Sequence, residues 1–142
     1  MDNALIIIFQ LVVLIFSVII HEISHGAVAL KLGDTTAKDA GRLTLNPLKH
    51  LDFVGSFLLP LFLFFAKAPI FGWAKPVPYN PFKLKNPKTG AGIIGAAGPL
   101  SNLLVASAFG IFLRAFAAWS PAGGESIFVY LLQIVVIINI AL

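Results

Sequence analysis

The sequence has 142 residues, of which 58% are hydrophobic and only 11% charged, and its net charge is +4. A soluble domain carries roughly 25% charged residues, so this composition excludes an ordinary soluble protein and predicts a multi-pass integral membrane protein of one domain. The basic residues lie between apolar segments, which argues against nucleic-acid binding, and the absence of cysteine excludes disulfides and thiolate metal sites.

The first predicted span covers residues 4–32. Its first part, ALIIIFQLVVLIFSVII, is interrupted only by Gln10 and Ser17, and Gly33-Asp34 follows as a typical helix end. A helix of this length is roughly 43 Å long, more than the ~30 Å hydrocarbon core of a bilayer. Neither a basic n-region nor a small-residue cleavage site is present, so we interpret the segment as a retained anchor rather than a signal peptide.

The C-terminal part of this span contains HEISH (21–25). On a helix, His21 and His25 lie one turn apart on the same face, where two imidazoles can bind one Zn²⁺. Glu22 lies about 100° round the helix, in position to take a proton from a water molecule that the metal activates. This is the HExxH arrangement of metalloproteases. The motif therefore predicts His21 and His25 as zinc ligands and Glu22 as the general base.

Other interpretations of the motif remain open at this point. A chance match or a structural histidine pair is disfavoured, because ionisable groups inside a span cost at least a few kcal/mol each and are usually functional. A haem site would need ligands on opposite faces of the iron, which two histidines on one helical face cannot supply. A proton or ion pathway in a transporter would need charged partners on the other spans, where only Arg114 occurs, near a span end.

The remaining elements complete an all-α prediction. Residues 34–52 form a polar connection in which GRLTLNP (41–47) alternates like a short β-strand ended by Pro47. A second span is expected near 51–65, with a kink at Pro60, and a third over 91–119, with small residues at its start that favour close helix packing. A fourth begins near Ile127.

The segment 67–90 contains five prolines and cannot form one regular helix, so we predict a re-entrant or interfacial loop there. The fold class is therefore an all-α membrane protein of about four transmembrane helices, with one short strand element and one proline-rich loop. Charge gives no orientation, because the loops on the two sides carry five basic residues each.

Four stretches, in order, carry a family resemblance: HEISHG, GRLTLNPLKHLD, GWAKPVPYNP and AAGPLSN. Together they resemble the site-2 protease family, most closely its compact prokaryotic branch. The resemblance covers essentially the whole chain. It implies a zinc-dependent intramembrane endopeptidase that cleaves transmembrane segments of other proteins, with one Zn²⁺ per active site, in a prokaryotic cell membrane. It also suggests a site that opens towards the cytoplasm, and it leaves the oligomeric state undetermined.

The resemblance extends to particular residues. It implies zinc binding by His21 and His25, catalysis by Glu22, and a place near the catalytic centre for Asn102, which could otherwise be an interhelical hydrogen-bonding residue. The region similar to the family's edge strand, where an extended substrate could pair, is Arg42, Leu43, Thr44, Leu45 and Asn46. The region similar to the family's membrane-dipping loop includes Lys75, Pro76, Val77 and Pro78.

One departure from the family pattern is important. The family's third zinc ligand is an aspartate in a Leu-Asp-Gly motif, at the far end of the span that starts here near Ile127, and the sequence reaches Leu142 first. We therefore expect residues 1–142 to be one metalloprotease domain that is incomplete at its C-terminus. Two alternatives remain open: Asp34 or Asp39 as a substitute ligand, or an inactive membrane protein that binds a partner helix in the same cavity.

Overall fold

The computed structural model describes residues 3–68, 73–119 and 126–142, and every regular element in them is helical. The predicted all-α class is therefore confirmed. The elements, in chain order, are α1 (Asn3–Lys31), α2 (Thr36–Asp39), η1 (Pro47–Lys49), η2 (Phe53–Leu58), α3 (Leu59–Phe65), η3 (Pro81–Lys83), α4 (Pro87–Trp119) and α5 (Ile127–Ala141).

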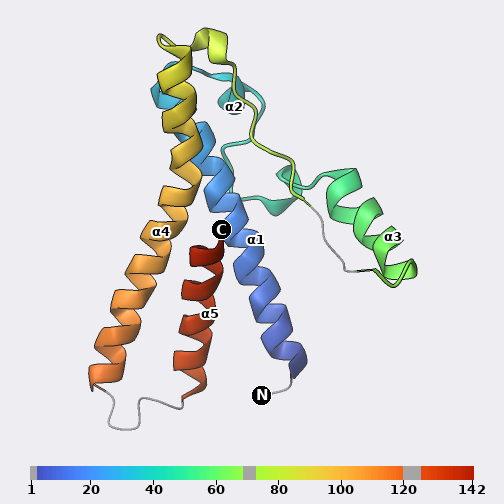
Figure 1. The fold of residues 1–142 in the computed structure, drawn as a ribbon, viewed down its shortest axis with the longest axis vertical. Helices are drawn as coiled ribbons and strands as arrows, with labels where there is room; N and C mark the ends of the chain where they lie inside the picture. Colours follow the sequence, from blue (N-terminus) through green and yellow to red (C-terminus); the bar gives the residue numbers. More distant parts are fainter. Residues whose placement is uncertain (1–2, 69–72, 120–125) are drawn as a thin grey trace.

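Three long helices form the body of the molecule (Figure 1). Helices α1 and α5 run in the same direction, and α4 runs antiparallel to both. Helix α4 packs against α1 and α5, while η2 and α3 form an arm that extends away from the three helices. The part of α1 that contains HEISH therefore lies against the first half of α4.

Helix α1 ends where the sequence predicted. Gly33 adopts a positive φ of 103°, which a residue with a side chain rarely tolerates. The amide of Gly33 donates to the carbonyl of Leu30, and the amide of Asp34 donates to the carbonyl of Ala29. This Schellman arrangement satisfies the last carbonyls of α1 and turns the chain sharply after Lys31.

The small residues at the start of α4 have two different roles. Gly90, Ala97 and Gly98 are buried. By contrast, a side chain at Gly92 or Gly95 would meet nothing within 4 Å. The predicted close approach of two helix backbones is therefore found at the buried positions only, because only they face α1 and the segment that precedes α4.

Helix α5 is attached to α1 by a buried polar contact. The amide of Asn139 donates to the hydroxyl of Ser17 at 2.9 Å, and both side chains are buried. Asn139 is therefore an interhelical hydrogen-bonding residue. Because Ser17 lies one turn before His21, this contact brings the last turn of α5 close to the level of the histidines.

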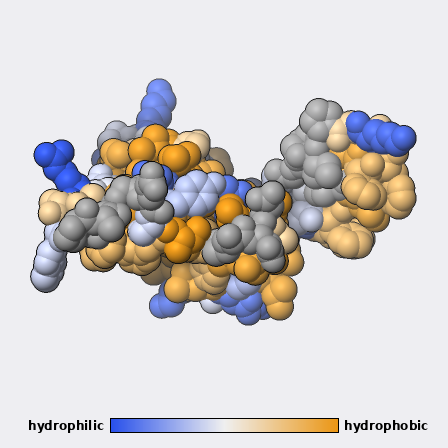
Figure 2. Space-filling view, turned by 90° about the horizontal axis from the view of Figure 1, so that it is seen from below, coloured by the Kyte–Doolittle hydropathy of each residue, from blue (hydrophilic) through white to orange (hydrophobic). Residues whose placement is uncertain are grey.

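Two helices, Ala4–Lys31 and Pro87–Trp119, are long and apolar enough to cross a membrane, and two shorter apolar helices cover Phe53–Phe65 and Ile127–Ala141. Large apolar side chains are exposed along α1 and α4, for example Leu5, Ile8, Leu104 and Ile111. Figure 2 shows hydrophobic surface over both the helix ends and the arm, with hydrophilic groups at the edges.

The second predicted span takes an unexpected form. It starts with the π-helical turn η2, and α3 begins only at Leu59, with Pro60 in its first turn. The side chain of Asp52 accepts a hydrogen bond from the amide of Gly55 at 2.7 Å and so caps the start of η2. Residues 69–72 of the proline-rich loop and residues 120–125 of the predicted turn lie outside the described residues.

The predicted strand at 41–47 is wrong. The described residues contain no strand, so this segment has no partner with which to form a ladder. Its polar groups bond locally instead. The hydroxyl of Thr44 accepts from the amide of Asn46, the side chain of Asn46 accepts from the amide of Leu48, and Arg42 donates to the carbonyl of Lys49. These contacts make a compact loop that leads into η1.

The segment 73–80, here called the strap, crosses from the arm to the end of α1. It is held by four backbone amides. Those of Trp73 and Lys75 donate to the carbonyls of Gly55 and His50. Those of Val77 and Asn80 donate to the side chains of Glu22 and Asp34. The strap is therefore extended without belonging to a sheet, and two carboxylates of the first long helix and its turn fix its position.

Asp34 is the buried anchor of the strap. Its carboxylate is fully buried and accepts hydrogen bonds from the hydroxyl and amide of Thr36 and from the amide of Asn80. Burial opposes ionisation, but these hydrogen bonds and the nearby Lys83 ammonium outweigh it and hold the pKa of Asp34 below its ordinary value.

Asp34→Asn should therefore destabilise the protein by about 2 kcal/mol at pH 7. Because the folded-state pKa is lowered, the stabilisation exists above the unfolded pKa of about 4 and is lost as the pH falls through the folded value. Thermal unfolding in detergent should show a lower Tm for the variant at pH 7, and a smaller difference in strong acid. Asp39→Asn, at an exposed position, is the matched control. Equal Tm values for wild type and Asp34→Asn at pH 7 would contradict the role of Asp34.

Candidate metal centre

Three potential metal ligands lie together on α1. The ligand atoms of His21, Glu22 and His25 are all within 4.8 Å of one another. Helical spacing explains this, because residues one and four positions apart sit on adjacent sides of the same turn. The two imidazole rings are 4.8 Å apart between centroids and nearly perpendicular, at 78°.

The backbone of α4 fixes the tautomer of His25. Nδ1 of His25 lies 2.6 Å from the carbonyl oxygen of Ile94. Because a carbonyl oxygen can only accept, Nδ1 must carry the proton and Nε2 must keep its lone pair. This second contact is the usual way in which a protein orients a metal-binding histidine.

Asn102 holds the second imidazole in a similar way. Its side-chain amide lies 3.1 Å from Nδ1 of His21, and Asn102 is fully buried. Among the described residues its Oδ1 has no hydrogen-bond partner. Turning the amide by 180° places Oδ1 against Nδ1, which can then donate a proton to it and leave the lone pair on Nε2. The buried amide therefore suits a metal-binding tautomer of His21.

Gly98 closes the site from the side of α4. A Cβ atom at this position would collide with Nε2 of both His21 and His25. Nε2 of both histidines therefore faces the same small space beside the backbone of Gly98. This space and its two nitrogen donors fit Zn²⁺, which prefers imidazole nitrogen in a tetrahedral arrangement.

The strap contacts the acidic member of the cluster. The backbone amide of Val77 donates to Oε2 of Glu22 at 2.8 Å. The carboxylate is thus oriented by a group 55 residues away in the sequence. Of Lys75, Pro76, Val77 and Pro78, which the sequence predicts near the site, the structure brings the amide of Val77 to Glu22.

Gly26 allows the connection segments to approach α1 directly after the motif. A Cβ atom there would lie 2.7 Å from side-chain atoms of both Leu43 and Val77. Within the 42–46 segment, Leu43 is therefore the residue whose side chain lies against Gly26. Leu45 and Asn46 are exposed. In the strap, the neighbouring residues Lys75, Pro76 and Pro78 are also exposed.

The described residues bring no other carboxylate to the histidines. Across residues 3–68, 73–119 and 126–142, the group that could hold a metal contains only His21, Glu22 and His25. Asp34 is bonded to Thr36 and the strap, and Asp39 accepts from the hydroxyl of Thr35. Neither aspartate is therefore placed as the substitute ligand that the sequence left open.

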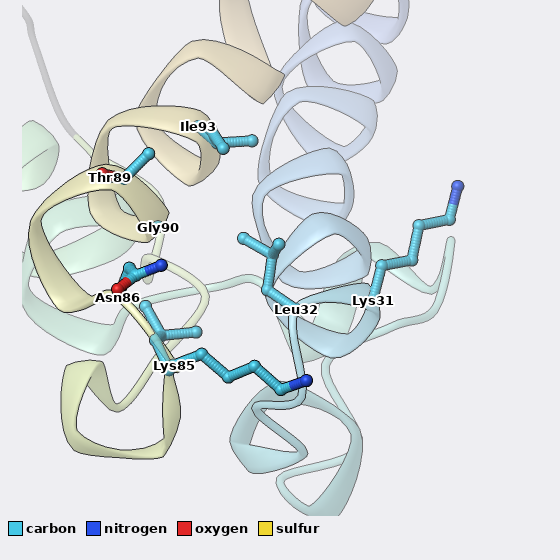
Figure 3. Close-up of a pocket in the computed structure, with 8 residues that line it drawn as sticks. Lys31, Leu32, Lys85, Asn86, Thr89, Gly90 and Ile93 are labelled. Atoms are coloured by element: carbon cyan, nitrogen blue, oxygen red, sulfur yellow. The ribbon is translucent and has the colours of Figure 1, made fainter.

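A separate pocket of about 330 Å³ lies where α4 begins, beside the end of α1. Figure 3 shows that Leu32, which directly follows α1, contributes to it, whereas Lys85, Asn86, Thr89, Gly90 and Ile93 come from the chain around the start of α4. None of its lining residues is a histidine or a carboxylate. This pocket therefore lacks metal-ligating chemistry and is distinct from the cluster.

Sequence reasoning missed two contributors on α4. Gly98 was interpreted only as a packing residue, and the carbonyl of Ile94 was not considered. A signal for both was present, because Ile94, Gly98 and Asn102 are spaced by four residues and so share one face of a helix. The asparagine predicted near the site thus marks the face that carries the other two.

Comparison with known proteins supports a metalloprotease class. The curated Bacillus subtilis (strain 168) protein "Putative zinc metalloprotease YwhC" is 44% identical over 105 residues, which cover 74% of this chain. The match spans 44% of that relative's length. No family model matches the chain, and no solved structure matches it.

The chain is therefore homologous to a bacterial protein named as a zinc metalloprotease, and it carries a histidine and glutamate cluster suited to that metal. This homology agrees with the resemblance to the site-2 protease family that HEISHG and the three later stretches carry.

Proposed function

We propose that this protein is a zinc-dependent intramembrane endopeptidase that cleaves transmembrane segments of other proteins. The observation that carries the proposal is the joint orientation of His21 and His25. Each Nδ1 is held by α4, each Nε2 faces Gly98, and the carboxylate of Glu22 lies within 4.8 Å of the histidine donors. A structural histidine pair would not need two free nitrogens directed at one space.

His21 and His25 would hold the zinc ion. When bound, zinc supplies a Lewis acid that polarises the scissile carbonyl and makes water more acidic. Glu22 takes a proton from the attacking water as the new carbon–oxygen bond forms, and it gives that proton to the amine nitrogen as the carbon–nitrogen bond breaks. The amide of Val77 keeps the Glu22 carboxylate in place while one oxygen remains available for the proton.

The membrane location rests on α1 and α4, the two helices long enough to span, and on their exposed apolar side chains. We propose that the shorter helices Phe53–Phe65 and Ile127–Ala141 complete a bundle of about four spans in a prokaryotic cell membrane. The strap and the 42–46 segment would then lie at the entrance to the site, where a substrate segment has to unwind before it can be cut.

The direction of α5 bears on the third zinc ligand. Asn139 pairs with Ser17, one turn before His21, and α5 runs parallel to α1. A helix continuing from α5 by one or two turns would come level with His21 and His25. We propose that the third protein ligand of the complete site comes from that position, since catalytic zinc usually has three protein ligands and water.

A cleavage assay in liposomes tests this function. The longest coding form of the protein should cut single-span substrate proteins, lose activity with a zinc chelator and regain it with Zn²⁺. His25→Ala should remain inactive after zinc is added back, because the imidazole held by Ile94 is gone. Cleavage by the His25→Ala variant at the wild-type rate would overturn the proposal.

A further inference from the structure

A second cavity, of about 550 Å³, lies along α1 before the candidate metal centre, and Ile19 is the last residue of α1 that lines it. Five apolar residues of α1 form one wall, and the loop around η1, the start of η2 and the strap form the other. The lining residues are Leu11, Leu14, Ile15, Val18, Ile19, Pro47, His50, Leu51, Gly55, Ser56, Trp73 and Ala74. We call this cavity the α1 groove.

Each wall of the α1 groove ends within three residues, along the chain, of a residue at the candidate site: Ile19 precedes Glu22, and Ala74 precedes Val77. Ile15, Val18 and Ile19 precede Glu22 by seven, four and three residues, so they share its face of the helix. On the opposite wall, the chain continues from Ala74 to Val77, whose amide donates to Glu22. The stretch from Leu11 to Ile19 is about 12 Å long, which suits several residues of an extended peptide.

One polar side chain in this apolar wall has an unused acceptor. His50 is only 2% exposed, and its Nε2 lies 2.8 Å from the carbonyl oxygen of Thr44. The carbonyl can only accept, so Nε2 carries the proton and Nδ1 keeps a lone pair. Within the described residues Nδ1 is buried and has no hydrogen-bond partner. A buried acceptor of this kind is satisfied when an occupant brings a donor.

Resting on the proposed function, we infer that the α1 groove binds the unwound substrate beside the scissile bond. Its apolar wall would take the substrate's hydrophobic side chains, and Nδ1 of His50 would accept a hydrogen bond from a substrate backbone N–H. The chemistry is complementary, because unwinding a helix in an apolar setting frees N–H groups that need an acceptor. The groove therefore favours substrates with large aliphatic residues next to the cut.

Cross-linking tests the occupancy independently of cleavage. The sequence has no cysteine, so single-cysteine variants are unambiguous. Ile15→Cys lies in the groove, and Ile111→Cys, on an exposed part of α4, is the matched control. In a Glu22→Gln background and with an added thiol oxidant, a leucine-rich spanning peptide of about 25 residues with one cysteine should form a disulfide with Ile15→Cys and not with the control. Equal cross-linking at both positions would overturn the inference. Loss of the reactivity of the Ile15→Cys thiol in the presence of lipid alone would also overturn it.

The role of His50 needs a readout that a structural role would not change. His50→Gln keeps a nitrogen that can donate to Thr44 and removes the ring atom Nδ1; its own acceptor, Oε1, lies on the same terminal carbon as the donor and not at the position of Nδ1. Wild type should lose about 10-fold in kcat/KM when one substrate amide near the cut is N-methylated, and His50→Gln should be insensitive to that methylation. An equal methylation penalty in both enzymes would refute the contact. Failure of the proposed function would instead appear as no cleavage by wild type, whatever the cross-linking result.

Discussion

Glu22→Gln is expected to abolish peptide cleavage while zinc binding is preserved. Glutamine has the same shape and keeps an oxygen that can accept from the amide of Val77, so the strap should stay in place. It cannot take a proton from water at neutral pH. General acid–base groups contribute about 10²- to 10⁴-fold to a rate, so cleavage should fall by at least about 100-fold.

The measurement pairs a cleavage assay with elemental zinc analysis of the same preparations. His21→Ala serves as the comparison, because it removes a predicted ligand and should lose zinc and activity together. Cleavage by Glu22→Gln at a rate near that of wild type would rule out Glu22 as the base. Loss of zinc in this variant would instead make Glu22 a ligand, as its place in the cluster also permits.

Gly98→Ala is expected to remove zinc without altering any ligand. The added methyl group would occupy the space into which Nε2 of both histidines points. Removing a residue that supports a single metal ligand typically lowers metal affinity 10- to 100-fold. A methyl group placed between two ligands should therefore lower zinc affinity at least about 100-fold. Zinc affinity can be measured by competition with a chelator of known strength.

Gly95→Ala provides a matched control on the same helix. A Cβ atom there meets nothing within 4 Å, and alanine favours a helix over glycine. This variant should therefore bind zinc like wild type and be at least as stable. Equal zinc affinity of the Gly98→Ala and Gly95→Ala variants would mean that the metal does not lie between the histidines and α4.

The long helices and the motif could be predicted from local sequence. The apolar run before HEISH, the Gly33 end and the Asp52 cap are all features of neighbouring residues, and each was found in the structure. The i, i+4 spacing of the histidines likewise follows from helix geometry alone. Homology over 105 residues to a protein named as a zinc metalloprotease agrees with the resemblance that the four stretches carry.

The contacts that complete the site could not be predicted in this way. Asn102 and His21 are 81 residues apart, and Glu22 and Val77 are 55 apart. Which glycine of α4 faces the histidines depends on the rotation of that helix, so Gly98 and Gly95 look alike in the sequence. The strand prediction failed for a related reason. The alternation of polar and apolar residues at 41–47 is a local pattern, whereas a β-strand also needs a neighbouring strand with which to form hydrogen bonds.

Zinc content per chain, compared between wild type and His25→Ala in the longest coding form of the protein, tests the central claim most directly. The account predicts about one zinc per wild-type chain and almost none in the variant, since His25 supplies one of the two nitrogen donors. Equal zinc in the two proteins, or none in wild type after incubation with Zn²⁺, would contradict a metal centre built on His21 and His25.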